Sequence, residues 1–473
     1  MLAPESPLLS GTYPDPSVVR VGDDFFLVTS TFEYFPALPI FHSTDLEHWT
    51  QLGHAVDRLD QVDLGDVASS GGLYAPTIRW HEGTFYLVCT LVGGSGSTGH
   101  FLLTATDASG PWSDPVWIEG EGFDPSLTFD EGRAWLVATR LAHEPQWHDQ
   151  AEVWMRELDL ATRTLVGPEH VLWHGAVENA VWAEGPHIYR IGEWYYLLAS
   201  EGGTEEHHAI SVARSREITG PYVGNRANPV FSHRALGIGH PITGVGHPDL
   251  VEGPDGQWWA VMLGSRPVGG YHALLGRETF ACPVDWEDEW PVFARGVGQL
   301  AVVDGMRRLA STVEVPNPWT QVRTRRLAGR VEGNAVTLHP GPGLEDVDTP
   351  AFLGVRQRDH RFEFAATVPA GMGIALRQSE AAHLLFSARG VVRVAAGRAE
   401  HVATVGEASR LRVMGDGNDY TLYADDRLVT TVDGRFLSTQ TAYALGGPSF
   451  VGVWVGLFST AESDVTATAV AYR

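Results

Sequence analysis

The sequence predicts an all-β protein in which a five-bladed β-propeller precedes a C-terminal β-sandwich. Three observations favour this fold class. A strand–turn–strand pattern recurs five times before residue 300, helical periodicity is scarce, and the composition changes near residue 305. Because 473 residues are enough for more than one domain, we expect a propeller domain over residues 1–305 and an accessory sandwich over residues 318–473.

Each copy of the repeat opens with a proline, passes through a Gly/Asp turn and continues into a strand that begins with aromatic residues. The copies read PDPSVVRVGDDFFLV, YAPTIRWHEGTFYLV, FDPSLTFDEGRAWLV, AEGPHIYRIGEWYYLL and GHPDLVEGPDGQWWAV. Their aromatic residues are Phe26, Tyr86, Trp135, Tyr196 and Trp259, at separations of 60, 49, 61 and 63 positions. Each interval holds about four short strands with loops, the content of one propeller blade. The alternative is a β-sandwich array with coincidental turns, and the shared register favours the propeller.

The carboxy-terminal part of the chain differs from the repeats in composition. Of the 16 tryptophans, only Trp319 and Trp454 lie beyond Trp290. The segment VPNPW resembles a linker, and alternating strands such as HRFEFAATVP follow it, separated by Asp-Gly and Gly-Asn turns. Turn-bounded strands of this kind predict a sandwich.

Composition excludes several classes of function. The formal net charge of −25 argues against binding nucleic acid or an anionic membrane. The chain has no lysine, which excludes a Schiff-base lysine and a P-loop. Its 2 cysteines are too few for a disulfide scaffold or a thiolate zinc site. The start MLAPESPLLSG lacks the basic and apolar regions of a secretory signal, and no run of about 20 apolar residues occurs. We therefore expect a cytoplasmic protein, with homo-oligomerisation left open.

Polar residues stand where the innermost strand of most blades begins, facing the expected propeller axis. They are Asp15, Asp124, Glu184 and His247, while the second copy has Ala75. Three carboxylates that share one apolar hollow raise one another's pKa, so that one keeps its proton while another stays ionised. Acid/base catalysis uses this division. The alternative is that an aspartate before proline merely caps a turn, and its recurrence in separate copies favours catalysis.

Other patterns give weaker signals. Adjacent His207 and His208 point to opposite faces of a strand, which disfavours a shared metal. The segment VGGSGSTG has neither the lysine nor the following helix of a phosphate-binding loop. No nucleophile elbow or Ser/His/Asp arrangement stands out. The predicted chemistry therefore requires no cofactor and no catalytic metal, and the sequence leaves a structural Ca²⁺ open.

The motifs also resemble those of a known family. In chain order they read GTYPDPSVVRVGDDFFLVTSTFEYFP, SGGLYAPTI, GFDPSL, WAEGPHIYRIGEWYYLLASEGGT, VGHPDLVE and LLGRETF, and they resemble glycoside hydrolase family 43. The likeness is to its two-domain β-xylosidases and α-L-arabinofuranosidases. It runs from residue 8 to about residue 293, and the tail SFVGVWVGLF resembles the family's C-terminal sandwich. The resemblance implies that Asp15 is the general base, Glu184 the general acid and Asp124 a third carboxylate that orients the acid and modulates its pKa.

Substrate-binding residues are implied in the same way. Arg277 would contact the terminal sugar and the carboxylates, and an aromatic of the sandwich would reach the pocket mouth. The alternatives without a role in binding are that Phe32, Phe450 and His247 are ordinary core residues and that Arg277 forms a structural ion pair. The sequence departs from the family's xylosidases at Tyr74, where they usually have tryptophan, at Thr77, where they have aspartate, and at Leu141, where an aromatic is replaced. The implied substrate-binding set is Phe32, Tyr74, His247, Arg277 and Phe450.

These features predict an inverting exo-glycosidase that releases terminal pentoses from a small oligosaccharide. The first interpretation is a β-1,4-xylosidase acting on xylo-oligosaccharides, and the alternative within the same mechanism is an α-L-arabinofuranosidase. A non-catalytic carbohydrate-binding propeller is the alternative from another class, and it would repeat one site in several blades. A retaining propeller glycosidase such as a fructosidase would need carboxyls about 5–5.5 Å apart, whereas an inverting enzyme needs about 6.5–9.5 Å.

Overall fold

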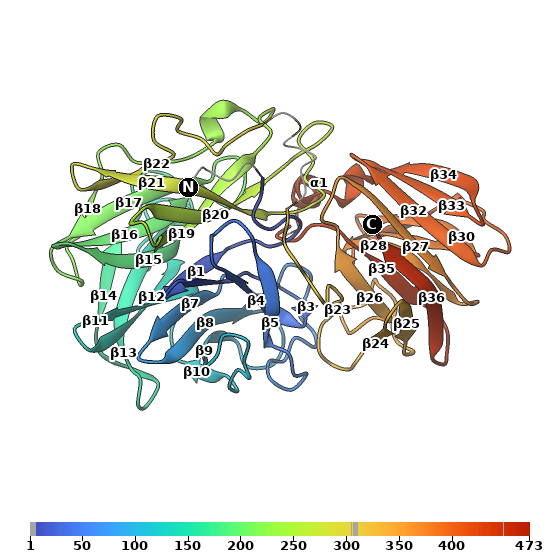
Figure 1. Cartoon of the computed structure of the whole chain (residues 1–473), viewed down its shortest axis with the longest axis horizontal. Helices are drawn as coiled ribbons and strands as arrows, with labels where there is room; N and C mark the ends of the chain where they lie inside the picture. The colour runs from blue at the N-terminus through green and yellow to red at the C-terminus, as the bar shows by residue number, and fades with distance from the viewer. Residues whose placement is uncertain (1–5, 304, 306–310, 448) are drawn as a thin grey trace.

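The computed structural model describes residues 6–303, 305, 311–447 and 449–473 and shows an all-β protein with two domains (Figure 1). Five small sheets surround a common axis in the N-terminal domain, and two larger sheets form the C-terminal domain. This arrangement confirms the predicted propeller followed by a sandwich. The predicted propeller boundaries are residues 1 and 305. They fall within or beside residues 1–5, 304 and 306–310, which lie outside the described part of the chain.

Each propeller blade is an antiparallel sheet of four strands, and the second blade has one additional short strand. The blades comprise, in order, β1 (Ser17–Val21), β2 (Asp24–Val28), β4 (Ala37–Ser43) and β5 (Thr50–Val56); β6 (Gly72–Leu73), β7 (Thr77–His81), β8 (Thr84–Val92), β9 (Gly99–Ala105) and β10 (Val116–Ile118); β11 (Phe123–Asp130), β12 (Arg133–Leu141), β13 (Ala151–Asp159) and β14 (Thr164–Trp173); β15 (Glu184–Ile191), β16 (Trp194–Glu201), β17 (Ala209–Ser215) and β18 (Val223–Gly224); and β19 (Thr243–Glu252), β20 (Trp258–Ser265), β21 (Glu278–Glu287) and β22 (Trp290–Phe293).

The sequence repeat corresponds to the hairpin between the two innermost strands of each blade. In the fourth blade this hairpin pairs Tyr189 of β15 with Tyr196 of β16. Its turn contains Gly192 at φ 62°, a conformation that glycine adopts without the steric cost of a Cβ atom. The first blade turns in the same way at Gly22, where φ is 64°. The regular register of the copies therefore reflects a common hairpin geometry.

Apolar side chains fill the spaces between neighbouring blades. Five separate buried clusters occupy the five interfaces around the ring. The cluster between the fifth and first blades contains Phe25 and Trp259, and Leu9 forms a bridge to Thr279 on β21. Packing between the first and last blades therefore closes the ring.

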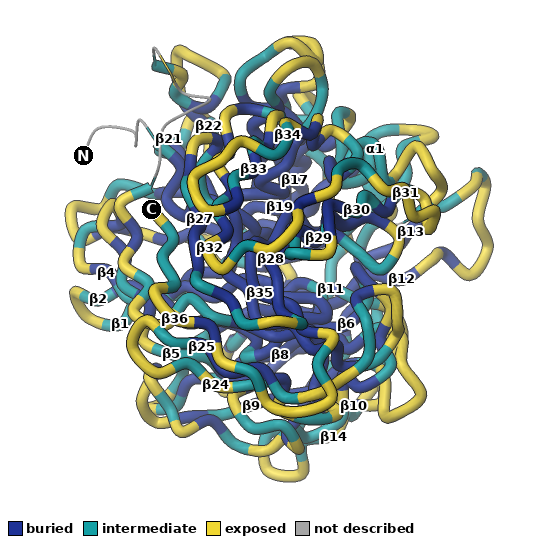
Figure 2. The backbone as a smooth tube through the Cα atoms, turned by 90° about the vertical axis from the view of Figure 1, so that its right-hand side faces the viewer, coloured by how far each residue is buried: buried dark blue, intermediate teal, exposed yellow. Residues whose placement is uncertain are grey.

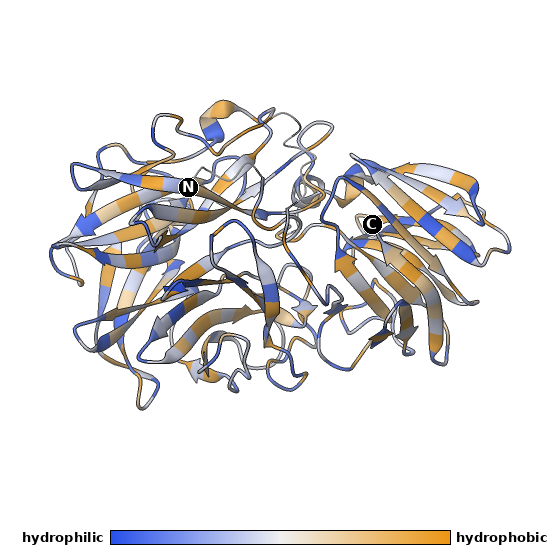
Figure 3. Cartoon of the chain, viewed as in Figure 1, coloured by the Kyte–Doolittle hydropathy of each residue, from blue (hydrophilic) through white to orange (hydrophobic). Residues whose placement is uncertain are grey.

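The sandwich packs a seven-stranded sheet against a six-stranded sheet around a core that includes Phe364, Leu376 and Leu457. Apolar and polar residues alternate along several of its strands (Figure 3), as expected for sheets with one buried face. The first sheet contains β24 (Gly329–Glu332), β25 (Ala335–Leu338), β36 (Val465–Tyr472), β27 (Arg361–Thr367), β32 (Arg410–Asp416), β33 (Asp419–Ala424) and β34 (Arg427–Asp433), and the second contains β26 (Phe352–Arg356), β35 (Trp454–Ser459), β28 (Met372–Ser379), β29 (Ala382–Ser387), β30 (Gly390–Ala395) and β31 (Arg398–Ala403).

The two domains meet along a buried seam. Strand β3 (Tyr34–Phe35) of the propeller pairs with β23 (Gln321–Val322), and Tyr34 stacks on Trp454 with ring centroids 3.6 Å apart. Viewed from the sandwich end, buried backbone fills the centre of the molecule and exposed backbone lies mainly in the peripheral loops (Figure 2). The short helix α1 (Thr439–Ala444), which follows η3 (Gly434–Leu437), lies at the junction of the domains (Figure 1).

The remaining described helical segment is η1 (Arg234–Leu236), in the propeller. No helix in the described part of the chain is long and apolar enough to cross a membrane.

Candidate active site

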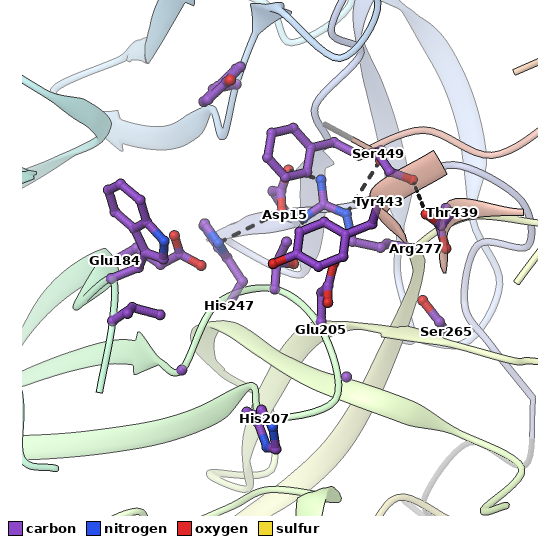
Figure 4. A pocket seen from close by; sticks show the side chains of 18 of the residues that line it. Asp15, Glu184, Glu205, His207, His247, Ser265, Arg277, Thr439, Tyr443 and Ser449 are labelled. Atoms are coloured by element: carbon purple, nitrogen blue, oxygen red, sulfur yellow. Dashed lines mark hydrogen bonds and ion pairs between the residues drawn. The ribbon is translucent and has the colours of Figure 1, made fainter. Parts of the chain in front are cut away.

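A pocket of about 1090 Å³ lies where the inner strands of the five blades begin (Figure 4). The sandwich domain also contributes to it, through the stretch from α1 to Phe450. Because the lining residues come from all blades and from the second domain, both domains are needed to form the pocket. All residues that the sequence singled out for catalysis or substrate binding line it, namely Asp15, Phe32, Tyr74, Asp124, Glu184, His247, Arg277 and Phe450.

A left-handed residue before a proline lies in, or just before, the first half of four of the inner strands. Asp15, Asp124 and His247 hold this position with φ values of 55°, 51° and 54°. In the fourth blade Gly185 holds it with φ 60°, so Glu184 lies one residue earlier. Non-glycine residues with such φ values are uncommon and gather at functional sites. The pairing register also shifts here, between Phe123 and Ser126, between Glu184 and His187, and between Gly246 and Asp249.

The Asp15 carboxylate is buried and held by three neighbours. Ser30 Oγ donates to Oδ2 at 2.5 Å, and Arg277 donates to Oδ1 at 3.0 Å and to Oδ2 at 3.4 Å. His247 Nδ1 lies 3.7 Å from Oδ1 (Figure 4). Burial lowers the pKa of His247, although the carboxylates of Asp15 and Glu184 oppose this effect. The guanidinium of Arg277 offsets part of the cost of burying a negative charge at this position.

The Asp124 carboxyl has the opposite electrostatic environment. Burial raises its pKa well above the ordinary value, and the nearby carboxylates of Glu184 and Asp15 raise it further. Arg277 and a hydrogen bond from the backbone N–H of Gly185 oppose the shift without cancelling it. This shift means that Asp124 keeps its proton to higher pH than an ordinary aspartate does.

Glu184 is the first residue of β15, and its side chain remains 14 % exposed. His208, which is fully buried, places Nε2 3.5 Å from Glu184 Oε1. Gly246 leaves room for this imidazole, because a Cβ atom there would lie 2.4 Å from His208 Nδ1. The neighbouring His207 is 73 % exposed, so the two histidines do not form a joint site. The buried histidine contacts the candidate acid.

An aromatic wall borders the carboxylates. Phe32, Tyr74 and Phe450 contact one another pairwise, with ring centroids 5.6–5.8 Å apart. Arg277 lies over Phe32 and Phe450, 5.5 and 5.3 Å from their centroids. Burial, followed by the charge of Asp124, raises the pKa of Tyr74 to about 12, so its hydroxyl stays a hydrogen-bond donor at neutral pH. The wall can therefore pack against a sugar ring and donate one hydrogen bond.

Comparison with family models agrees with this geometry. Residues 4–291 match the model described as glycosyl hydrolases family 43. The chain belongs to glycoside hydrolase family 43. Residues 316–472 match a model described as a β-xylosidase C-terminal concanavalin A-like domain. A family 43 protein is a glycoside hydrolase with a small carbohydrate substrate, and this assignment rejects the alternative of a non-catalytic carbohydrate-binding propeller.

Similar proteins include both specificities considered from the sequence. The family 43 chain is 43 % identical over 387 residues to a xylosidase/arabinosidase of Butyrivibrio fibrisolvens, covering 76 % of this chain and 74 % of that protein. It is 35 % identical to a non-reducing end α-L-arabinofuranosidase of Bacteroides ovatus, covering 97 % and 92 %. The crystal structure of a xylan β-1,4-xylosidase from Bacillus halodurans superposes with a TM-score of 0.88 at 27 % identity, covering 99 % and 100 %.

The structure also shows how this family 43 site differs from the expected pattern. Leu141, where an aromatic was expected, is 51 % exposed, and buried Thr77 donates its hydroxyl to the carbonyl of Pro125 at 2.9 Å. Trp182 lines the pocket and packs against Phe123, with ring centroids 5.8 Å apart. Trp182, which opens the motif WAEGPH but was given no role from the sequence, therefore supplies a further aromatic surface.

Sequence reasoning missed three kinds of pocket residue in this family 43 chain. Trp182 lies two positions before Glu184, outside β15 and with φ 53°, so no strand periodicity marks it. Thr204, which accepts a hydrogen bond from Arg277 at 2.8 Å, follows the fourth blade's second strand without a distinctive spacing. Tyr443 comes from the short helix of the second domain, far away in the sequence.

The described residues were also compared with the side-chain groupings that hold metal ions in proteins. Over residues 6–303, 305, 311–447 and 449–473, no group of three or more His, Cys, Asp and Glu side chains is arranged to hold a metal ion. The independence of catalysis from a cofactor stays a prediction, as does the presence or absence of a structural Ca²⁺.

Proposed function

We propose that this family 43 enzyme is an inverting exo-glycosidase that releases terminal pentoses, with β-1,4-xylosidase activity on xylo-oligosaccharides. The observation that carries the proposal is the convergence of three carboxyl groups from three blades on one pocket, with the pKa of Asp124 raised. Similarity to the xylosidase/arabinosidase of Butyrivibrio fibrisolvens and to the xylan β-1,4-xylosidase of Bacillus halodurans supports xylose as the released sugar.

In this proposal Asp15 is the general base. Its ionised carboxylate takes a proton from a water molecule, and the oxygen of that water attacks the anomeric carbon. Arg277 and Ser30 keep the carboxylate oriented through the hydrogen bonds described above. The attack inverts the configuration at the anomeric carbon because the leaving group departs from the opposite face.

Glu184 is the general acid, and Asp124 keeps a proton available to it. Burial and the neighbouring carboxylates raise the pKa of Asp124, so a protonated carboxyl stands beside Glu184. As the glycosidic bond breaks, Glu184 donates a proton to the leaving oxygen. The remaining negative charge of the pocket stabilises the oxocarbenium-like transition state. Asp15 has gained one proton and Glu184 has lost one, so exchange with solvent restores the starting state.

Exo action follows from the shape of the site. The carboxylates lie where inner strands begin, and the aromatic wall of Phe32, Tyr74 and Phe450 encloses them on one side. A terminal pentose can occupy such a pocket, whereas the interior of a polysaccharide would have to pass through the wall. The enzyme therefore releases one sugar at a time from the chain end.

The test combines product stereochemistry with two variants. We expect proton NMR of the first product formed from a β-xyloside to show α-xylose, and release of β-xylose would reject single displacement. Asp15→Asn and Glu184→Gln should each lower kcat by about 10²–10⁴-fold while leaving the far-ultraviolet circular dichroism unchanged. Turnover near the wild-type rate in either variant would reject its assigned role.

An α-L-arabinofuranosidase activity is the second candidate. It is favoured by the departures at Tyr74, Thr77 and Leu141 and by the similarity to the Bacteroides ovatus α-L-arabinofuranosidase over 97 % of this chain. Parallel assays with 4-nitrophenyl β-D-xyloside and 4-nitrophenyl α-L-arabinofuranoside separate the two. A higher kcat/KM for the arabinofuranoside would make that activity the principal one.

A further inference from the structure

The domain seam contains a buried ion pair that is bonded to the propeller loop before β6. Arg377 of β28 donates to Glu33 Oε1 at 3.3 Å, and the backbone N–H of Ser70 donates to Glu33 Oε2 at 3.1 Å. All three residues are fully buried. Arg377 also donates to Tyr34 Oη and Ser69 Oγ, at 2.8 Å each. Because a buried charge is stable only with its partners in place, this cluster holds the loop firmly against the sandwich.

From Ser70 the hydrogen bonds continue to the candidate base. The backbone N–H of Phe450 donates to Ser70 Oγ at 3.0 Å, and the backbone carbonyl of Phe450 accepts from Arg277 Nε at 3.4 Å. Arg277 in turn binds both oxygens of Asp15. The peptide of Phe450 therefore links the seam to the guanidinium that pairs with the base.

Two glycines allow the segments that carry Arg277 and Phe450 to touch. A Cβ atom on Gly452 would lie 2.5 Å from the backbone nitrogen of Gly276, and a Cβ atom on Gly276 would lie 2.7 Å from the nitrogen of Gly452. The backbone N–H of Gly452 donates to Thr12 Oγ1 at 2.9 Å. A side chain at Gly452 would therefore separate the two segments.

We propose that Ser70 and Gly452, two residues outside the pocket lining, are positioning residues through which the sandwich domain holds Arg277 against Asp15. The inference rests on the proposed function, since it takes Asp15 as the general base. A nearby guanidinium favours the ionised carboxylate. When the Phe450 peptide loses its anchor, the guanidinium can turn away, and Asp15 then takes up a proton at higher pH. The accessory domain thus tunes the base without contacting the reacting atoms.

The experiment uses Ser70→Ala and Gly452→Ala in the full-length enzyme with 4-nitrophenyl β-D-xyloside. We expect kcat/KM at the optimum to fall about tenfold. The acidic limb of the kcat/KM profile should move to higher pH by about half a unit or more. On this scale one pH unit corresponds to a tenfold change in the proton affinity of the titrating group. Ser211→Ala and Gly53→Ala are matched controls. Ser211 Oγ is buried with no hydrogen-bond partner among the described residues, and a Cβ atom on Gly53 would meet its nearest neighbour at 3.8 Å.

Neither variant adds or removes an ionisable group around Asp15. These groups are Arg277 before β21, His247 on β19, Asp124 on β11, Glu184 on β15, Tyr74 before β7 and Cys89 on β8. A shift of the acidic limb would therefore be due to a changed position of Arg277.

The outcomes separate this inference from the proposed function. A wild-type enzyme that hydrolyses no pentoside would overturn both. An active wild type whose profile superposes on those of Ser70→Ala and Gly452→Ala would overturn the inference alone. If Gly452→Ala fails to fold, Ser70→Ala decides, since it removes one oxygen atom and adds no bulk.

Discussion

Replacing Asp249 should destabilise the propeller more than any exposed ion pair could. Its carboxylate is fully buried on β19 and accepts hydrogen bonds from three other blades. Ser17 Oγ donates at 2.7 Å and the backbone N–H of Val18 at 3.0 Å, Arg79 donates twice at 2.8 and 3.1 Å, and Tyr189 Oη donates at 2.5 Å. The inner strands of four blades therefore depend on one acceptor group.

Asp249→Asn removes the charge while keeping the size of the side chain. It leaves Arg79, with 15 % of its side chain exposed, without its counter-ion, and breaking a buried pair in this way costs about 3–5 kcal/mol. Burial alone would raise the pKa of Asp249, but Arg79 and then His187 lower it below the ordinary value of 3.8. A carboxyl with a lowered pKa stabilises the fold above its unfolded pKa and loses this effect as pH falls. The difference between wild type and variant should thus be full at pH 7 and shrink below about pH 4.

Urea unfolding followed by tryptophan fluorescence measures this difference. The matched control is Asp23→Asn, which removes the exposed partner of Arg20 at 3.8 Å and should cost about 0–1 kcal/mol. The double variant Arg79→Met/Asp249→Leu should recover part of the loss, because no unpaired charge remains buried. Equal destabilisation by Asp249→Asn and Asp23→Asn would refute the reasoning, as would a difference that grows on acidification.

Two further predictions concern the pocket. Asp124→Asn removes a carboxyl whose pKa is raised in the fold by burial and then by Glu184. A carboxyl with a raised pKa contributes less to the stability of the fold as pH rises above its pKa in the unfolded chain. Asp124→Asn should therefore stabilise the protein relative to wild type increasingly from about pH 4 upward. Paired thermal melts at pH 4 and pH 8 check this, and a difference in melting temperature that stays constant with pH would contradict it. Gly185→Ala and Gly192→Ala place a Cβ atom at nearly the same φ, 60° and 62°, but only at Gly185 does it lie 2.8 Å from the ring of His247. Both should lose about 1 kcal/mol from backbone strain, and Gly185→Ala about 1–3 kcal/mol more together with activity; identical unfolding midpoints would show that the His247 contact does not matter.

The fold could be predicted because its repeating unit is local. A hairpin such as that between Tyr189 and Tyr196 is specified by a turn and two adjacent strands, so its period appears directly in the sequence. The contacts between blades involve residues that are far apart in sequence. They need no motif, since any apolar side chains of suitable volume can fill the interfaces.

The candidate site could be predicted only in part, for the same reason. Asp15, Asp124 and Glu184 occur in the repeated motif, so aligning the copies with one another is enough to group them. Ser70 and His208 lie in loops and contact other segments of the chain, Glu33 and Phe450 in the first case and Glu184 in the second. No spacing in the sequence marks such contacts.

The single position before the strand-opening proline explains why fold and chemistry coincide in the motif. Proline disfavours the right-handed helical region for the residue before it, and in four blades that residue is left-handed. Aspartate tolerates this conformation better than most residues, and Asp15 and Asp124 use it to aim a short side chain into the pocket. At Gly185 the absence of a side chain lets the longer Glu184 enter from the preceding residue. The backbone kink is thus common to these blades, and the residue that occupies it decides whether a blade contributes an aspartate, an imidazole or space for a glutamate from the preceding position.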